Sequence, residues 1–276
     1  MYNSYEIDDE LNEKFNKIGK LKNKNKISRL EMVKISIENI LRPLVIKSPN
    51  VKVGLVTFGD ALKVKGDCLS NILIVKRKHL DDESKIECLG KENTNLIQSE
   101  INKSYEKIIK TLNELEMFTA LGPGILLSLS LLDKANPGSR IFLSTDGVSN
   151  LGVGKILTDN IEQKYFYEKI GNIARKKGIS ISLIAFEDSE SKIDILKSMV
   201  ELSGGDIFRV NPKYILDEMN DFLEYQIIAS EVEIKMNLNK CLTFRDEEKK
   251  DMTNDGSTIL KKIGNATKEK EKYIEL

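Results

Sequence analysis

Residues 140–154, RIFLSTDGVSNLGVG, decide the fold class of this 276-residue chain. The apolar run 140–144 predicts a strand, and the polar, glycine-rich residues after it predict a loop at the carboxyl end of that strand. Ligands of doubly wound α/β sheets gather at the carboxyl ends of strands, and Asp146 lies there. Hydrogen bonding within its own loop, before Gly147, explains this aspartate equally well.

Helical and extended patterns alternate on both sides of this stretch, which predicts an α/β fold with a doubly wound, mostly parallel, Rossmann-like sheet. The first helix opens with Ser28 as N-cap and Glu31 at the capping-box position. A further helix opens at the turn Gly122-Pro123-Gly124 and stops at Asn136. The remaining predicted helices cover 96–114, 162–177, 192–205 and 212–225, and the strands cover 51–59, 140–144, 178–186 and 206–210.

The composition divides the chain into three parts. Residues 1–27 are polar and are expected to form a loop or tail, and residues 28–227 carry the α/β pattern. Residues 228–276 form a β extension, because 231–238 alternates in polarity and 257–263 repeats a short-strand signal. We expect this extension to be the beginning of a β-sandwich. Within the α/β part, 66–90 predicts only an edge strand at 71–75 and a loop.

Composition also excludes several classes of function. Lys and Arg number 43 and so do Asp and Glu, so no net charge attracts nucleic acid or an anionic membrane. Three scattered cysteines (Cys68, Cys88 and Cys241) and one histidine, His79, support neither a disulfide framework nor a zinc site. No apolar run reaches the roughly 20 residues of a membrane span, and the first residues do not resemble a signal peptide. A cytoplasmic location is therefore expected.

A second polar residue belongs to the same end of the predicted sheet. Thr119, in FTALGPG, precedes a helix and lies where strand ends and helix starts meet. Taken alone, Thr119 is explained equally well as the N-cap of the helix that follows it. Together with Asp146 it places a second polar side chain on the loop side of the predicted sheet.

The order of these features resembles the von Willebrand factor type A (vWA) domain. The matching segments are SRLEMVKISIENIL and VKVGLVTFGD, then TALGPGILLSL, STDGVSNLG, and IARKKGISISLIAF leading to LSGGDIFRV; together they cover roughly residues 28–226. The resemblance implies a metal-ion-dependent adhesion site (MIDAS) that holds Mg²⁺, with Thr119 and Asp146 as metal ligands. It also implies a non-enzymatic protein-interaction module, whose partner completes the metal site with a carboxylate.

One part of the vWA pattern is missing. The first strand, which ends in Asp-x-Ser-x-Ser and carries about half of the metal ligands, has no counterpart before Ser28. We therefore expect that the chain starts inside that motif and that a strand is absent between VKVGLVTFG and RIFLS. The metal site is expected to be partial and to bind Mg²⁺ poorly.

Two other functions stay open. The C-terminal strands also suit the trunk-type vWA domain of a vesicle-coat or multi-domain scaffold protein. Gly147, Gly152 and Gly154 after a strand suggest a phosphate loop of a Rossmann-like small-molecule enzyme, although neither the G-x-G-x-x-G nor the P-loop spacing is present. A nucleotide-sized pocket beside Gly147 would favour the enzyme.

Overall fold

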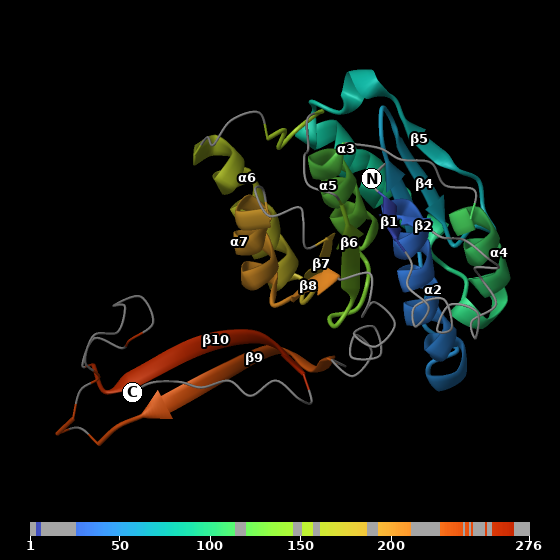
Figure 1. Cartoon of the computed structure of the whole chain (residues 1–276). Helices are drawn as coiled ribbons and strands as arrows, with labels where there is room; N and C mark the ends of the chain where they lie inside the picture. The colour runs from blue at the N-terminus through green and yellow to red at the C-terminus, as the bar shows by residue number, and fades with distance from the viewer. Residues whose placement is uncertain are drawn as a thin grey trace.

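The computed structural model describes residues 4–6, 26–113, 120–145, 151–156, 161–186, 193–210, 227–239, 241–242, 244, 252 and 256–267. Figure 1 shows an α/β unit with a long two-stranded ribbon beside it. The described α-helices are α2 (Arg29–Lys47), α3 (Glu83–Glu92), α4 (Ile101–Asn113), α5 (Leu121–Leu131), α6 (Ile161–Lys176) and α7 (Ile193–Ser203). The strands are β1 (Ser4–Glu6), β2 (Lys26–Ser28), β3 (Leu55–Phe58), β4 (Leu62–Gly66), β5 (Leu73–Val75), β6 (Arg140–Ser144), β7 (Ser180–Phe186), β8 (Ile207–Val210), β9 (Ile227–Asn237) and β10 (Thr258–Thr267).

The first helix begins as the sequence predicts. The backbone N–H of Glu31 donates to Ser28 Oγ at 3.2 Å, and the backbone N–H of Ser28 donates to Glu31 Oε2 at 2.9 Å. This reciprocal capping box satisfies two backbone donors that the first turn of a helix otherwise leaves without partners. The predicted start of α2 is confirmed.

The parallel part of the predicted sheet is confirmed in β6, β7 and β8, which pair in that order. The helix between β7 and β8 stops at Gly204, whose φ of +74° suits glycine. The backbone N–H of Gly205 then donates to the carbonyl oxygen of Val200 at 3.0 Å, which closes the end of α7. The predicted helix C-cap at 203–205 is therefore confirmed.

The region 66–90 corrects the sequence analysis. The predicted edge strand is present as β5, but β3, β4 and β5 form an antiparallel sheet in which β4 was not predicted. Helix α3 was missed as well, because its charged sequence ESKIECLGKE has a weak apolar period and contains Gly90. In the fold, Gly90 is the point at which α3 packs closely on α5, since a Cβ there would lie 2.4 Å from Ser130 Cβ. Close packing on α5, a tertiary effect, outweighs local propensity.

The described strands of the α/β unit form two sheets rather than one. β3 ends the sheet β3-β4-β5 and β6 ends the sheet β6-β7-β8, with no described strand pairing the two. Helix α5 contacts both β3 and β6. The break falls between the two segments where the sequence analysis expects a strand to be absent.

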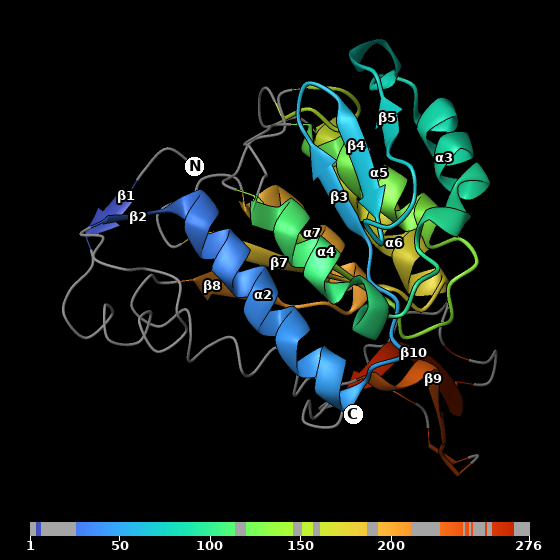
Figure 2. The ribbon, with the colours of Figure 1, turned by 90° about the vertical axis from the view of Figure 1, so that its right-hand side faces the viewer.

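Helices cover both faces of these sheets, as a doubly wound fold requires. α3, α5, α6 and α7 lie on one face, and α2 and α4 lie on the other (Figures 1 and 2). One apolar core joins both sheets, because Val64 of β4 and Leu143 of β6 belong to the same buried cluster as α5. A smaller cluster around Leu41, Ile101 and Ile108 joins α2 to α4.

Both ends of the chain add strands. The polar opening segment, expected to be a loop or tail, contains β1 and β2, which pair antiparallel, and Ile27 is fully buried. β9 and β10 form the expected C-terminal ribbon, on which Val232, Ile234 and Met236 are half-buried and the intervening residues are exposed. The predicted helix 212–225 lies outside the described residues. None of the described helices combines the length and apolar character needed to cross a bilayer.

Candidate functional site

Both predicted metal ligands, Thr119 and Asp146, lie outside the described residues, but the residues next to them are described. Ala120 is fully buried at the start of α5, and Thr145 is buried directly after β6. Ser144, the last residue of β6, has a buried Oγ that finds no hydrogen-bond partner in the described part of the chain. Because a buried polar group is costly without a hydrogen-bond partner, this hydroxyl requires one from outside the described residues.

The start of α5 packs directly on the loop that follows Asp146. A Cβ at Gly122 would lie 2.1 Å from the carbonyl oxygen of Val153, so only glycine allows this approach. Gly152, with φ +78°, lies in the same way against Pro123, where a Cβ would be 2.4 Å from Cγ. The contact brings the segment after Thr119 and the segment after Asp146 to one place in the fold.

Two hydrogen bonds fix the loop 151–156. The backbone N–H of Val153 donates to the carbonyl oxygen of Leu80 at 2.8 Å. The hydroxyl of Tyr167, a fully buried side chain on α6, donates to the carbonyl oxygen of Gly154, also at 2.8 Å. We call this assembly, the start of α5 with the loop 151–156, the α5–loop junction.

Sequence reasoning missed the residues that build the α5–loop junction. Gly122 was read only as part of a turn, although its place inside the first helical turn is a signal for close packing. Tyr167 was read only as part of an amphipathic helix, and its neighbour Tyr165 is 69% exposed. Nothing in the local pattern separates these two tyrosines, because the carbonyl that Tyr167 meets comes from a loop thirteen positions away.

The glycines of the loop have a structural explanation that requires no phosphate. A Cβ at Gly154, with φ +67°, would lie 2.4 Å from the ring of Phe166, and Gly152 is equally confined. Two shallow hollows of the described surface lie on α3 and on α6, and neither includes a residue of the loop 151–156. The described residues therefore provide no support for a nucleotide pocket beside this loop.

The described donors do not form a cation site by themselves. Among the residues that the structure describes, no group of three His, Cys, Asp or Glu side chains is placed to hold a metal ion. The end of β6 offers the hydroxyls of Ser144 and Thr145, whereas Mg²⁺ requires close to six oxygen ligands, carboxylate included. Any metal site at this edge requires oxygen ligands from outside the described residues.

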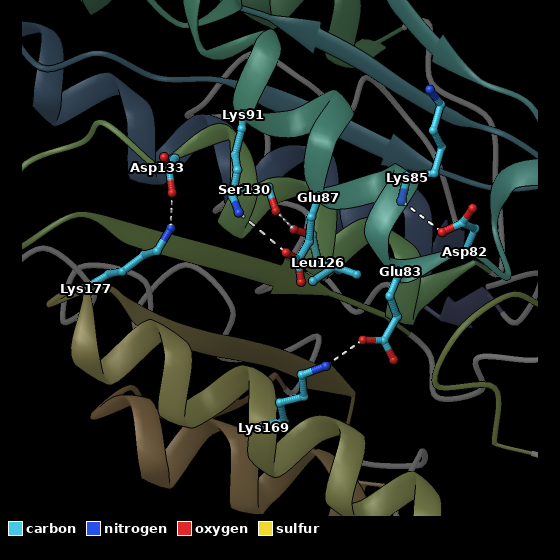
Figure 3. A network of polar contacts seen from close by, with 10 residues as sticks. All are labelled: Asp82, Glu83, Lys85, Glu87, Lys91, Leu126, Ser130, Asp133, Lys169 and Lys177. Atoms are coloured by element: carbon cyan, nitrogen blue, oxygen red, sulfur yellow. Dashed lines mark hydrogen bonds and ion pairs between the residues drawn. The ribbon is translucent and has the colours of Figure 1, made fainter.

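Two ion pairs between elements tie α6 to the rest of this face (Figure 3). Lys169 Nζ lies 2.6 Å from Glu83 Oε2 on α3, and Lys177 Nζ lies 2.5 Å from Asp133 Oδ1 just after α5. The hydrogen bond to Glu83 raises the pKa of Lys169, and the hydrogen bond from Lys177 lowers the pKa of Asp133. Because all four side chains are partly exposed, each pair contributes at most about 1 kcal/mol.

The pKa values of two described cysteines, Cys68 and Cys88, are raised above the ordinary value of a thiol. Cys88 Sγ donates to Glu92 Oε1 at 3.1 Å, and this hydrogen bond raises the pKa of the thiol. Burial raises the pKa of Cys68. Both shifts favour the protonated thiol, which is the unreactive form.

Sequence comparison with known proteins finds a relative but no family model. No family model matches the chain. The chain is 27% identical over 230 residues to Circularly permutated Ras protein 1 of Dictyostelium discoideum; this match covers 81% of the chain and 27% of that protein. The chain thus spans about a quarter of the length of the curated relative that it matches.

Two solved structures resemble the described fold. The human COPII-coat protein Sec24c matches with a TM-score of 0.53 and 14% identity, over 71% of this chain and 30% of that one. A von Willebrand factor type A protein from Catenulispora acidiphila matches with a TM-score of 0.51 and 10% identity, over 77% and 42% of the two chains. At these identities the likeness concerns the fold. The chain has a vWA-like, Rossmann-like α/β fold.

Proposed function

We propose that this chain is a non-enzymatic protein-interaction module of the vWA type, with a partial MIDAS in which Thr119 and Asp146 bind Mg²⁺. The observation that supports it is the α5–loop junction, where Gly122 contacts Val153 and so brings together the segments that follow the two ligands. The buried hydroxyl of Ser144, which has no partner among the described residues, is in keeping with a polar ligand at the same edge.

The partner completes this site. One hydroxyl and one carboxylate are too few fixed oxygens to offset the dehydration of Mg²⁺, so the chain alone binds the ion weakly. A carboxylate from a protein partner adds a charged oxygen, and the metal then links the two proteins. Nucleic acid is not the proposed partner, because a chain with zero net charge has no overall attraction for a polyanion. The proposed location is the cytoplasm, in keeping with the free thiols of Cys68, Cys88 and Cys241.

A trunk-type vWA domain of a coat or scaffold protein is the second candidate. It is supported by the likeness to the coat protein Sec24c and by the ribbon β9–β10, whose half-buried apolar face suits a larger β-structure. On this basis the chain divides into a polar segment 1–27, a vWA-like domain 28–227 and a β extension 228–276. The Rossmann-like enzyme receives no support from the described surface.

Thermal melting in the presence of Mg²⁺ tests the proposed site. With a millimolar Kd, 10 mM Mg²⁺ stabilises the folded chain by about 1.4 kcal/mol, which raises the Tm by roughly 3–6 °C. Thr119→Ala and Asp146→Asn are expected to abolish this rise, whereas Asp81→Asn, at an exposed aspartate, is expected to leave it intact. If Mg²⁺ raised the Tm equally in all three variants, Thr119 and Asp146 would not be ligands of the metal. A micromolar Mg²⁺ affinity by calorimetry would contradict the partial site.

A further inference from the structure

Strand β5 is the outermost strand of the sheet β3-β4-β5 (Figure 1). The ladder between β3 and β4 fixes which way its backbone groups point. The N–H of Gly59 donates to the carbonyl oxygen of Ala61 at 3.0 Å, which makes these two residues a hydrogen-bonded pair of that antiparallel ladder. Because such pairs alternate along a ladder, the backbone groups of Lys63 face β3 and those of Leu62 face β5.

The same alternation continues into β5. Leu62 lies opposite Val75, and Val64 lies opposite Leu73, so these two pairs carry the hydrogen bonds between β4 and β5. Ile74, between them, directs its N–H and C=O groups away from β4. No described strand lies on that side of β5. The outer edge of β5 therefore offers backbone donors and acceptors to an added strand.

Apolar side chains accompany this open edge. Val75 is 1% exposed and belongs to the apolar core, whereas Ile74, on the opposite face of β5, is 53% exposed. Leu69 and Ile72, just before the strand, are each 48% exposed. Exposed apolar residues are ordinarily scattered singly, and a group of them is typical of an interaction surface. We call Leu69, Ile72, Ile74 and the outer backbone of β5 the β5 edge.

The charge around the β5 edge is positive. Residues 61–80 include five lysines and arginines and a single acidic residue, Asp67. Asp67 is buried, and its carboxylate accepts the backbone N–H groups of Leu69 and Ser99 at 3.0 Å each, so its charge is used within the fold. Three exposed basic residues follow β5 directly: Lys76, Arg77 and Lys78. The next acidic residues along the chain are Asp81 and Asp82, at the start of α3, where Asp82 caps the helix.

The backbone edge, the apolar side chains and the charge together select the occupant. Two copies of this edge repel each other, because both carry the same positive charge. A lipid surface covers apolar side chains but offers no partners to the N–H and C=O groups of Ile74. An extended acidic peptide meets all three requirements, because it brings a backbone ladder, alternate apolar side chains and carboxylates.

We propose that the β5 edge binds an extended acidic segment of a protein partner, which adds a strand to the sheet beside β5. The added strand runs antiparallel to β5, as the existing pairs of this sheet do. Its apolar side chains contact Ile72 and Ile74, and its carboxylates lie beside Lys76 and Arg77. The site goes beyond the proposed metal contact, because it involves neither Thr119 nor Asp146.

Amide exchange of the whole chain, resolved by NMR, tests the site with the synthetic peptide Asp-Glu-Thr-Val-Thr-Val-Thr-Asp. Run antiparallel to β5, this peptide places its valines opposite Ile74 and Ile72 and its glutamate opposite Lys76. In the free chain the N–H of Ile74 is expected to exchange faster than that of Val75, which is bonded to β4. At ten times its Kd the peptide is expected to slow exchange at Ile74 about tenfold and to leave β9 and β10 unchanged.

A matched peptide separates strand pairing from attraction between charges. The control carries N-methyl groups on its two valines, which removes the N–H donors that face β5 and keeps every side chain. It is expected to leave exchange at Ile74 unchanged, because the ladder cannot form.

A matched pair of charge variants locates the site. Lys76→Glu replaces an attraction by a repulsion and is expected to weaken peptide binding roughly two- to twentyfold. Lys107→Glu changes the net charge equally at an exposed position of α4 and is expected to weaken binding less than twofold. An NMR titration of each variant measures both affinities.

Four results would overturn the proposal. One is an Ile74 amide that exchanges as slowly as that of Val75 in the free chain, which would mean that the edge is already paired. Another is unchanged exchange at Ile74 with 1 mM peptide while phosphatidylserine vesicles slow it, which would assign the surface to a membrane. Equal protection by the N-methylated peptide would reduce the binding to charge, and equal weakening by Lys76→Glu and Lys107→Glu would place it elsewhere.

Discussion

Replacing Tyr167 by phenylalanine removes one hydroxyl from the α5–loop junction and keeps the ring. The hydroxyl donates to the carbonyl oxygen of Gly154 at 2.8 Å, and the ring meets Phe166 edge-on with centroids 5.2 Å apart. Because the side chain is fully buried, the loss of this hydrogen bond costs about 1–2 kcal/mol. In a domain of this size that corresponds to a fall in Tm of roughly 2–8 °C.

The effect on the loop is the more specific readout. Tyr167→Phe is expected to speed amide exchange in 151–156 several-fold, because the bond from Val153 to Leu80 then holds the loop with less support. Tyr165→Phe, two positions earlier on α6 and 69% exposed, is expected to change stability by no more than about 0.5 kcal/mol. If both variants melt alike and exchange alike in the loop, Tyr167 does not anchor the junction.

Three further predictions concern single buried groups. Burial raises the pKa of Asp67, but hydrogen bonds from Ser99 and nearby amides outweigh burial and lower the pKa below its ordinary value. The ionised Asp67 therefore stabilises the fold at neutral pH, and this stabilisation is lost on acidification below about pH 4. Urea titrations from pH 3 to 7 are expected to show a flatter pH dependence in Asp67→Asn. Ser203→Ala leaves the buried N–H of Ile181 without its acceptor at 3.0 Å and is expected to lower the unfolding free energy by about 1–3 kcal/mol in urea. Gly122→Ala forces a Cβ to 2.1 Å from a loop carbonyl oxygen, and an unchanged Tm would contradict the close contact described for α5, since overpacking costs about 1–3 kcal/mol.

The sequence predicts those elements whose signal is local. The capping box of α2 lies within four residues, and the buried strand β7 ends in the apolar run 183–186. β4 and α3 are not predicted from the sequence because contacts with distant segments determine them. In β4, the sequence LKVKG buries Leu62 and Val64 on one face and leaves the lysines on the other. So short an alternation does not distinguish a strand from a loop.

The candidate site divides in the same way. Asp146 and Thr119 can be proposed from the sequence because each follows or precedes a predicted element at the edge where such sheets bind ligands. The side chains that support this edge, such as Tyr167, act on a segment distant in sequence, and only the fold reveals their partners. The burial of the Ser144 hydroxyl has no sequence signal, since a serine at the end of a strand is ordinarily solvated.

Helix α5 connects β3 with the loop 151–156. Gly124 contacts Phe58 on β3, while Gly122, half a turn earlier, contacts Val153 in the loop after Asp146. Side-chain packing, rather than strand pairing, joins the two sheets, and the buried apolar residues of α5 contribute about 1.5–3 kcal/mol each. Packed helices move as units and not by continuous deformation. Helix α5 therefore holds β3 and the loop 151–156 in a fixed relation, through Gly124 on one side and Gly122 on the other.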